Sequence, residues 1–116
     1  MKFNSDFKFD LEIGQMGEKT LASILEGSTV EVKTDIKTKV TGNVFVEYMS
    51  RDKLSGISTT KAQWYAFIVE DRIVILPTEK LKVIARKYFN TDRDVRGGDN
   101  NTSKGLLVPF KELTEV

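Results

Sequence analysis

The chain has 116 residues and a net charge of +1, which suits one domain with a modest core of its own. It contains no cysteine and no histidine, which excludes disulfides, thiol nucleophiles, thiolate zinc sites and imidazole-based triads. Any catalysis would therefore depend on carboxylate, lysine and hydroxyl groups. The natural metal is a hard cation held by oxygen ligands, Mg²⁺ first and Mn²⁺ as the substitute.

The composition is that of a folded chain, with 40% apolar and 30% charged residues. No apolar run approaches the ~20 residues of a membrane helix, and residues 1–10 lack the apolar centre of a secretory signal. We therefore expect one domain over residues 1–116, in the cytoplasm and without a membrane partner. Net charge gives no indication of nucleic-acid binding, because a domain that binds by bulk charge is more basic.

The N-terminal quarter predicts an arm followed by a helix. Residues 1–10 form either a loose, flexible arm or a short strand. Residues 14–26 have helical periodicity, and Gly27 is suited to end that helix. Its apolar stripe comprises Leu21, Ala22, Ile24 and Leu25.

Two strands with alternating character follow. Residues 30–35 predict the first strand and residues 43–49 the second. Because the connection is short and ends at Thr41-Gly42, we expect an antiparallel hairpin. One face of the first strand carries Glu31, Lys33 and Asp35, and the other carries Val30, Val32 and Thr34; in the second strand Glu47 shares a face with Asn43, Phe45 and Met49.

The central segment predicts a loop, a second helix and two short strands. Residues 51–58 form the loop, and the helix begins at Thr59 or Thr60, since Thr60 and Gln63 fit a capping box. The strands at 67–69 and 73–76 turn at Glu70-Asp71. The predicted helix carries Ala62, Trp64, Tyr65 and Ala66.

The last part predicts a third helix, opened by Pro77-Thr78, a long polar loop over residues 90–104 and a final strand at 106–108. The helix stripe comprises Leu81, Ile84, Ala85 and Tyr88. The resulting order, α-β-β-α-β-β-α-β, predicts an α/β fold with one mixed sheet flanked by helices.

The charged row on the first strand has two interpretations. Its three side chains cannot all enter an apolar core cheaply, so the row either faces water or forms a site. In the expected hairpin, Glu47 lies opposite Glu31 or close to it, and a bound cation would remove the repulsion. The alternatives are that Lys33 neutralises the acids, or that the register is shifted by one residue.

Two further features point to the same region. Glu18 lies on the apolar stripe of the first helix, where it either caps the first turn or points towards the site. The run Ser55-Gly56-Ile57-Ser58-Thr59-Thr60-Lys61 leads into the second predicted helix. Free backbone N–H groups at such a terminus suit a phosphate, and the alternative is an ordinary helix cap.

Taken together, these residues resemble the PD-(D/E)xK nuclease superfamily, which includes Holliday junction resolvases and many restriction endonucleases. Glu31-Val32-Lys33 is similar to its Glu-x-Lys element, and Gly17-Glu18 to its helical glutamate. Over residues 11–110 the chain resembles small phage and bacterial members of this superfamily. That likeness also includes Thr41-Gly42-Asn43 with Glu47, the serine- and threonine-rich run at 55–62 and the stretch at 97–105.

The resemblance implies a restriction-endonuclease-like core and a Mg²⁺-dependent nuclease, endo or exo, in a bacterial or phage-infected cell. The metal ligands would come from Glu31, Asp35, Glu47 and Glu18, with Lys33 as the catalytic cation. The chain departs from the family pattern, because no aspartate lies between Asp10 and Asp35. Either Asp35 or Glu47 replaces it beside Glu31 and Lys33, or Asp35 is the strand aspartate, Glu47 the second carboxylate, and Lys33 or Lys61 the lysine.

The implied partner is DNA, duplex or branched, and a homodimer would help so small a domain to grip it. Phosphate contacts give affinity without reading sequence. The rival functions are a catalytically silent module on the same fold that binds nucleic acid or protein, and a structural subunit with no site. The expected DNA-contacting residues are Ser55, Thr59, Thr60, Lys61, Lys37, Lys39, Arg51 and Lys104, with Lys53, Arg93 and Arg96 beside them.

Overall fold

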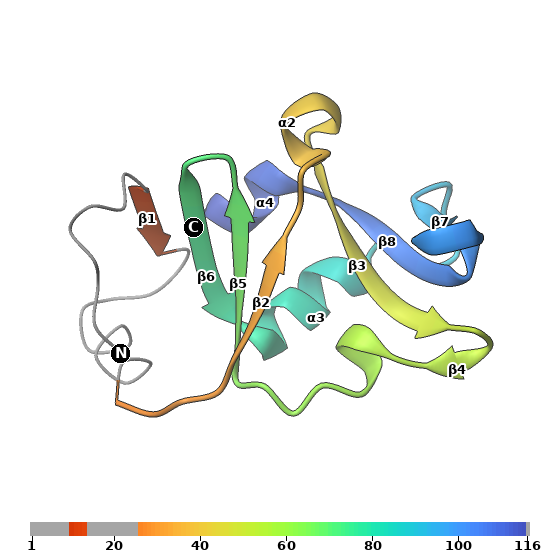
Figure 1. Ribbon diagram of the computed structural model, residues 1–116, viewed down its shortest axis with the longest axis horizontal. Helices are drawn as coiled ribbons and strands as arrows, with labels where there is room; N and C mark the ends of the chain where they lie inside the picture. Colours follow the sequence, from red (N-terminus) through yellow and green to blue (C-terminus); the bar gives the residue numbers. More distant parts are fainter. Residues whose placement is uncertain (1–9, 14–25, 116) are drawn as a thin grey trace.

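The computed structural model of the chain describes residues 10–13 and 26–115. Over these ranges the strands form two four-stranded sheets, and short helices connect some of the strands along the chain (Figure 1). The α/β class is as predicted, but the described strands form two sheets and not one, and their order differs from α-β-β-α-β-β-α-β. Most of the helix predicted at residues 14–26, and residues 1–9 of the predicted arm, lie outside the described residues.

The first sheet has the strand order β1-β6-β5-β2, with both parallel and antiparallel pairs. Strands β5 (Trp64–Val69) and β6 (Arg72–Pro77) form the predicted antiparallel hairpin. At its turn Glu70 adopts a left-handed backbone, with φ of 56°. The outer strands β1 (Asp10–Ile13) and β2 (Val30–Thr34) run parallel to β6 and β5 respectively.

The second sheet has the order β4-β3-β8-β7 and is antiparallel throughout. Its long strands are β3 (Asn43–Ser50) and β8 (Ser103–Pro109), and its edges are β4 (Lys53–Leu54) and β7 (Asp94–Gly97). The predicted loop at 90–104 therefore contains β7, a 3₁₀ turn η2 (Asp99–Asn101) and the start of β8. The antiparallel partner of β7 is β8, which begins inside the same predicted loop and continues beyond it. The polar composition of the loop therefore did not indicate that it contains an edge strand.

The predicted hairpin between residues 30–35 and 43–49 is wrong, although both strands exist. The short helix α2 (Thr38–Thr41) fills the connection, and Gly42 ends it with a left-handed φ of 76°. This turn directs β3 into the second sheet, where it pairs with β8, while β2 pairs with β5. Figure 1 shows α2 at the point where the two sheets meet.

The helix predicted from Thr59 or Thr60 is also wrong, because residues 64–69 form β5. The Thr60 side chain accepts a hydrogen bond from the backbone N–H of Ala62, two residues on, which makes a turn and not a capping box. The aromatic and β-branched residues of this segment favour a strand, and alternate ones are buried in the core. Ahead of β5 lies only the 3₁₀ turn η1 (Gly56–Ser58).

The core lies between the two sheets and is closed by helix α3 (Thr78–Arg86), which was correctly predicted after Pro77. A second short helix, α4 (Phe110–Thr114), ends the described chain and buries Leu113. No helix in the described ranges is both long and apolar enough to cross a membrane. The most deeply buried side chains are Phe67, Leu76, Leu81, Val44, Val74 and Val108.

Candidate functional site

The charged face of β2 is turned towards the second sheet. Glu31 is in register with Tyr65 and Lys33 with Phe67, and neighbours at paired positions of a parallel sheet lie on the same face. Tyr65 and Phe67 both belong to the core between the sheets. Val32, on the opposite face, is 55% exposed. The alternation in this strand therefore places Glu31 and Lys33 on the face towards the second sheet, where Glu31 is half-buried and Lys33 is exposed at the sheet edge.

Glu47 reaches the same region from the other sheet. It is in register with Gly105 of β8, next to a β-bulge that lies between Glu47 and Met49, so the prediction that it pairs opposite Glu31 is wrong. Its carboxylate Oε2 accepts a hydrogen bond from the Ser55 hydroxyl at 2.8 Å. That bond holds the carboxylate in one orientation at the start of η1.

Lys33 and Glu47 line one small pocket between the two sheets, with a volume of about 150 Å³. The two residues therefore meet through packing of the sheets and not through strand pairing. Apolar side chains form the rest of the wall, so a charge inside it is less screened than one on the surface. The lining is completed by Phe45, Val46, Gly56, Tyr65 and Phe67.

The Tyr65 phenol is influenced by both the Glu31 and the Glu47 carboxylates. Burial raises the pKa of its phenol, and the negative charges of Glu31 and Glu47 raise it further, while a hydrogen bond with Thr60 acts in the opposite direction. Both acids therefore act on one hydroxyl group. Tyr65 was not predicted as a site residue, because its segment was expected to be a helix. The alternation of Tyr65, Phe67 and Val69 is the sequence signal for its strand.

Asp35 is held apart from this pocket. Its Oδ1 accepts hydrogen bonds from the backbone N–H groups of Lys37 at 3.0 Å and Thr38 at 3.1 Å, and its Oδ2 accepts one from Phe45 at 3.2 Å. These bonds fix the start of α2 and join β3 to the end of β2. Asp35 lines a separate cavity of about 340 Å³, which also contains Arg96.

The described lining of the pocket contains one carboxylate, Glu47, and Glu31 lies near enough to influence the Tyr65 phenol. Mg²⁺ commonly takes one or two protein carboxylates and completes its octahedron with water and substrate phosphate, so these two acids are the candidates for holding one. Within residues 10–13 and 26–115, no group of three or more acidic side chains is arranged to hold a metal. Glu18, the remaining predicted ligand, lies outside the described residues.

The residues expected to contact DNA are scattered. Ser55 is bonded to Glu47 and Thr60 to Tyr65, so these two contact residues that line the pocket. The expectation of a helix N-terminus after residue 58 is wrong, because only the three-residue turn η1 is present there. Arg93 donates to the Asn43 side chain and to the Leu107 carbonyl, which makes it part of the fold. The exposed members of the set are Lys37, Lys39, Arg51, Lys53, Thr59, Lys61 and Arg96, and Lys104 is half-buried over the Tyr48 ring.

Comparison with known proteins finds no relative of the chain. No protein-family model, no curated protein and no solved structure matches the chain.

Proposed function

We propose that the protein is a divalent-metal-dependent nuclease that hydrolyses phosphodiester bonds of DNA at the pocket between the sheets. The observation that carries the proposal is the meeting of Lys33 and Glu47 in this pocket, with Glu31 acting on the same phenol, Tyr65. A lysine beside two carboxylates is the set that the resemblance to PD-(D/E)xK nucleases implies. The proposal includes the finer points of that resemblance: a restriction-endonuclease-like core, a duplex or branched substrate, a cytoplasmic location and a homodimer.

Each residue has a distinct part in this proposal. Glu31 and Glu47 would hold Mg²⁺ or Mn²⁺, and the metal would supply an activated water and neutralise charge on the phosphate. The Lys33 ammonium would bind a phosphate oxygen and stabilise the negative charge that develops there. Ser55 keeps the Glu47 carboxylate in place through its hydrogen bond. Asp35 supports the site indirectly, by joining β2 to β3.

The test is cleavage of end-labelled duplex and four-way-junction DNA by the full chain with MgCl₂ and with EDTA. Glu47→Gln and Lys33→Met should each lower the Mg²⁺-dependent rate by at least about 100-fold, a loss typical of removing one transition-state contact. Glu79→Gln and Lys111→Met change the same charges at exposed positions away from the pocket and should cleave normally. Full activity of both pocket variants would show that the site is elsewhere or absent.

A second candidate is a module on the same fold that binds nucleic acid or protein without cutting. It is favoured by the three backbone hydrogen bonds that engage Asp35, and by the absence of a three-acid cluster within the described ranges. Titration with Mg²⁺ alone, observed by amide NMR, separates the two. Saturable shifts at Glu31 and Glu47 support the enzyme, whereas shifts that appear only with DNA support the binding module.

A further inference from the structure

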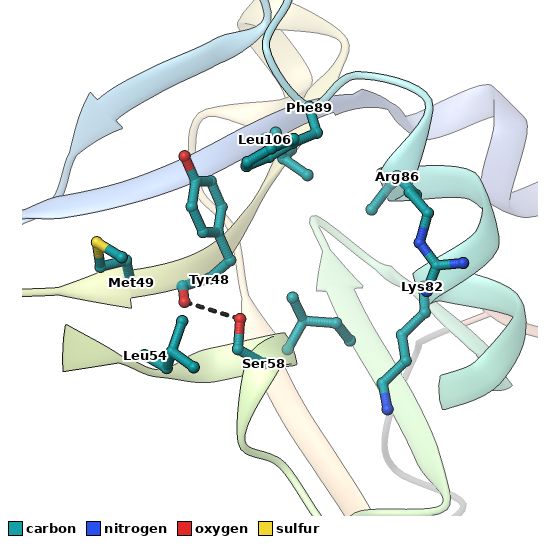
Figure 2. Close-up of a pocket in the computed structure, with 10 residues that line it drawn as sticks. Tyr48, Met49, Leu54, Ser58, Lys82, Arg86, Phe89 and Leu106 are labelled. Atoms are coloured by element: carbon teal, nitrogen blue, oxygen red, sulfur yellow. Dashed lines mark hydrogen bonds between the residues drawn. The ribbon is translucent and has the colours of Figure 1, made fainter.

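An open groove of about 650 Å³ lies between β3, η1 and α3, separate from the pocket of Lys33 and Glu47. Figure 2 shows Tyr48, Met49 and Leu54 on one side and two cations of α3, Lys82 and Arg86, on the other. We call it the β3–α3 groove. Its volume lies within the range of ligand-binding clefts, ~300–1,000 Å³. The remaining lining residues are Ile57, Ser58, Ala85, Phe89 and Leu106.

The apolar wall of the groove is rigid. The Tyr48 hydroxyl donates to Asp94 at 2.6 Å, and the Tyr48 carbonyl accepts hydrogen bonds from the Ser58 hydroxyl at 2.9 Å and the Ser55 N–H at 3.1 Å. The Tyr48 and Phe89 rings meet edge to face, with centroids 5.5 Å apart and an interplanar angle of 72°. A wall fixed in this way loses little conformational freedom when a ligand binds.

Apolar surface remains open to water at the rim. Leu54 is 64% exposed and Phe89 is 50% exposed, although both lie beside buried Ile57 and Leu106. Contiguous exposed apolar side chains of this kind are typical of interaction sites. Met49 adds a flexible side chain that adapts to the shape of a partner.

The opposite wall is cationic. Lys82 has one ion pair, with Glu79 at 3.3 Å; the Glu79 side chain is 85% exposed, so the pair is weak and easily exchanged. Arg86 is exposed, and its guanidinium has no ion pair or hydrogen bond within the described residues. Among the described residues, no acidic side chain lines the groove. Asp94 contacts Tyr48 of the groove wall, and its oxygens accept from the Tyr48 hydroxyl and the Asn90 N–H.

We infer that the β3–α3 groove binds an acidic amphipathic peptide segment of another protein. Apolar side chains at helical spacing would fill the space between Leu54, Tyr48 and Phe89, and acidic residues beside them would pair with Lys82 and Arg86. A nucleic-acid strand fits less well, because stacking needs free aromatic faces, and the Tyr48 ring has Phe89 on one side and the Lys104 ammonium 5.9 Å from its centroid. This inference does not rest on nuclease activity.

The experiment uses the full chain and a synthetic helical peptide with leucine or phenylalanine at positions i, i+3, i+4 and i+7 and glutamate elsewhere. Binding is followed by amide NMR and calorimetry. A matched peptide carries lysine at each glutamate position. We expect saturable shifts at groove residues for the acidic peptide, affinity at least about tenfold weaker for the lysine peptide, and weaker binding at high salt.

Variants assign the binding to the groove. The double variant Lys82→Glu with Arg86→Glu, and separately Phe89→Ser, should each weaken binding at least about tenfold. Val83→Ser is the matched control, since Val83 is 59% exposed on the same helix but does not line the groove, and its affinity should stay within about twofold of the parent. Circular dichroism verifies that each variant is folded.

Four outcomes would overturn the inference: no saturable shift up to about 1 mM peptide, equal binding of the lysine peptide, undiminished binding by the charge-reversed variant, or shifts confined to other surfaces. A groove that responds to single-stranded DNA or to a second copy of the chain, and not to the acidic peptide, would also overturn it. A Glu47→Gln variant that loses DNA cleavage should still bind the peptide with the same affinity. The failure of this inference can therefore be told apart from the failure of the proposed function.

Discussion

The pocket between the sheets and the β3–α3 groove share β3 and η1, yet they differ in almost every physical respect. The pocket takes Val46, Glu47 and Gly56, is small, and places a lysine and the Glu47 carboxylate among aromatic side chains. The groove takes Tyr48 and Ile57, is about four times larger, and sets exposed apolar side chains against Arg86 and the weakly paired Lys82. Consecutive stretches of one strand thus line two different cavities, residues 45–47 the small pocket and residues 48–49 the open groove.

The two regions depend on the fold to different degrees. Changes at the pocket disturb backbone contacts between sheets, so they should alter stability as well as activity. Changes at the groove rim remove exposed side chains, so they should alter binding alone. Four substitutions test this contrast.

Gly56→Ala should have the largest effect, with a loss of about 3 kcal/mol in the free energy of unfolding. A Cβ at this position would lie 2.2 Å from the backbone oxygen of Glu47, and the glycine φ is +52°. Chemical denaturation measures the loss. Gly42→Ala is the control, since its φ of +76° carries the same backbone strain with nothing within 4 Å, and about 1 kcal/mol is expected. Equal losses would mean that the contact of η1 with Glu47 contributes nothing.

Asp35→Ala should lower the unfolding free energy by about 2 kcal/mol, because three backbone N–H groups lose their acceptor. The same denaturation experiment on Asp92→Ala, an exposed aspartate with no such bonds, should give a change within about 0.5 kcal/mol. If Asp35→Ala abolished cleavage without a loss of stability, Asp35 would act as a metal ligand and not as the link between β2 and β3.

Tyr48→Phe should cost about 1.5 kcal/mol, since the bond from its hydroxyl to Asp94 involves a charged acceptor. Burial, together with the hydrogen bond and charge of Asp94, raises the pKa of Tyr48 from 10.0 to about 12. The folded chain therefore keeps a proton that the unfolded chain loses, so this contribution is complete below pH 10.0 and disappears as the pH rises to about 12. Stability measured across that window should fall less steeply in Tyr48→Phe, and an unchanged slope would contradict the assignment.

Leu54→Ser should change the unfolding free energy by no more than about 0.5 kcal/mol, because Leu54 is 64% exposed. It should nevertheless weaken binding of the acidic peptide several-fold. A thermal melt beside a peptide titration tests both parts. A large loss of stability would show that Leu54 supports the fold, and the contrast between pocket and groove would then be wrong at this residue.

Local patterns predicted most of the elements but not how the strands pair. The alternation in β2 and β3, the turn at Glu70-Asp71 and the helix after Pro77 are all found in the structure. The pairing of β2 with β5 depends on contacts more than 30 residues apart and on the turn that α2 makes, and neither leaves a periodic signal. For the same reason, β7 could not be recognised within a polar stretch.

The candidate site was predicted in part and for a partly mistaken reason. Lys33 and Glu47 were expected together because a hairpin seemed to pair their strands, whereas packing of two sheets brings them into one pocket. Asp35 was expected beside them, but short-range geometry gives it three backbone partners instead. Tyr65 was missed because Thr60 and Gln63 matched a capping box, and a local match of that kind is outweighed by burial of alternate residues.

The bulge in β3 constrains how this protein can change over time. Glu47 and Met49 pair with adjacent residues of β8, Gly105 and Lys104, so Tyr48 is one residue more than a regular ladder would hold. Deleting one residue here would restore regular pairing, but it would remove the wall of the groove and turn the next side chains to the opposite face. The length of β3 is therefore set by two cavities together. We therefore expect β3 to tolerate substitutions better than insertions or deletions, and the β3–β4 turn at Arg51 and Asp52 to tolerate a change in length.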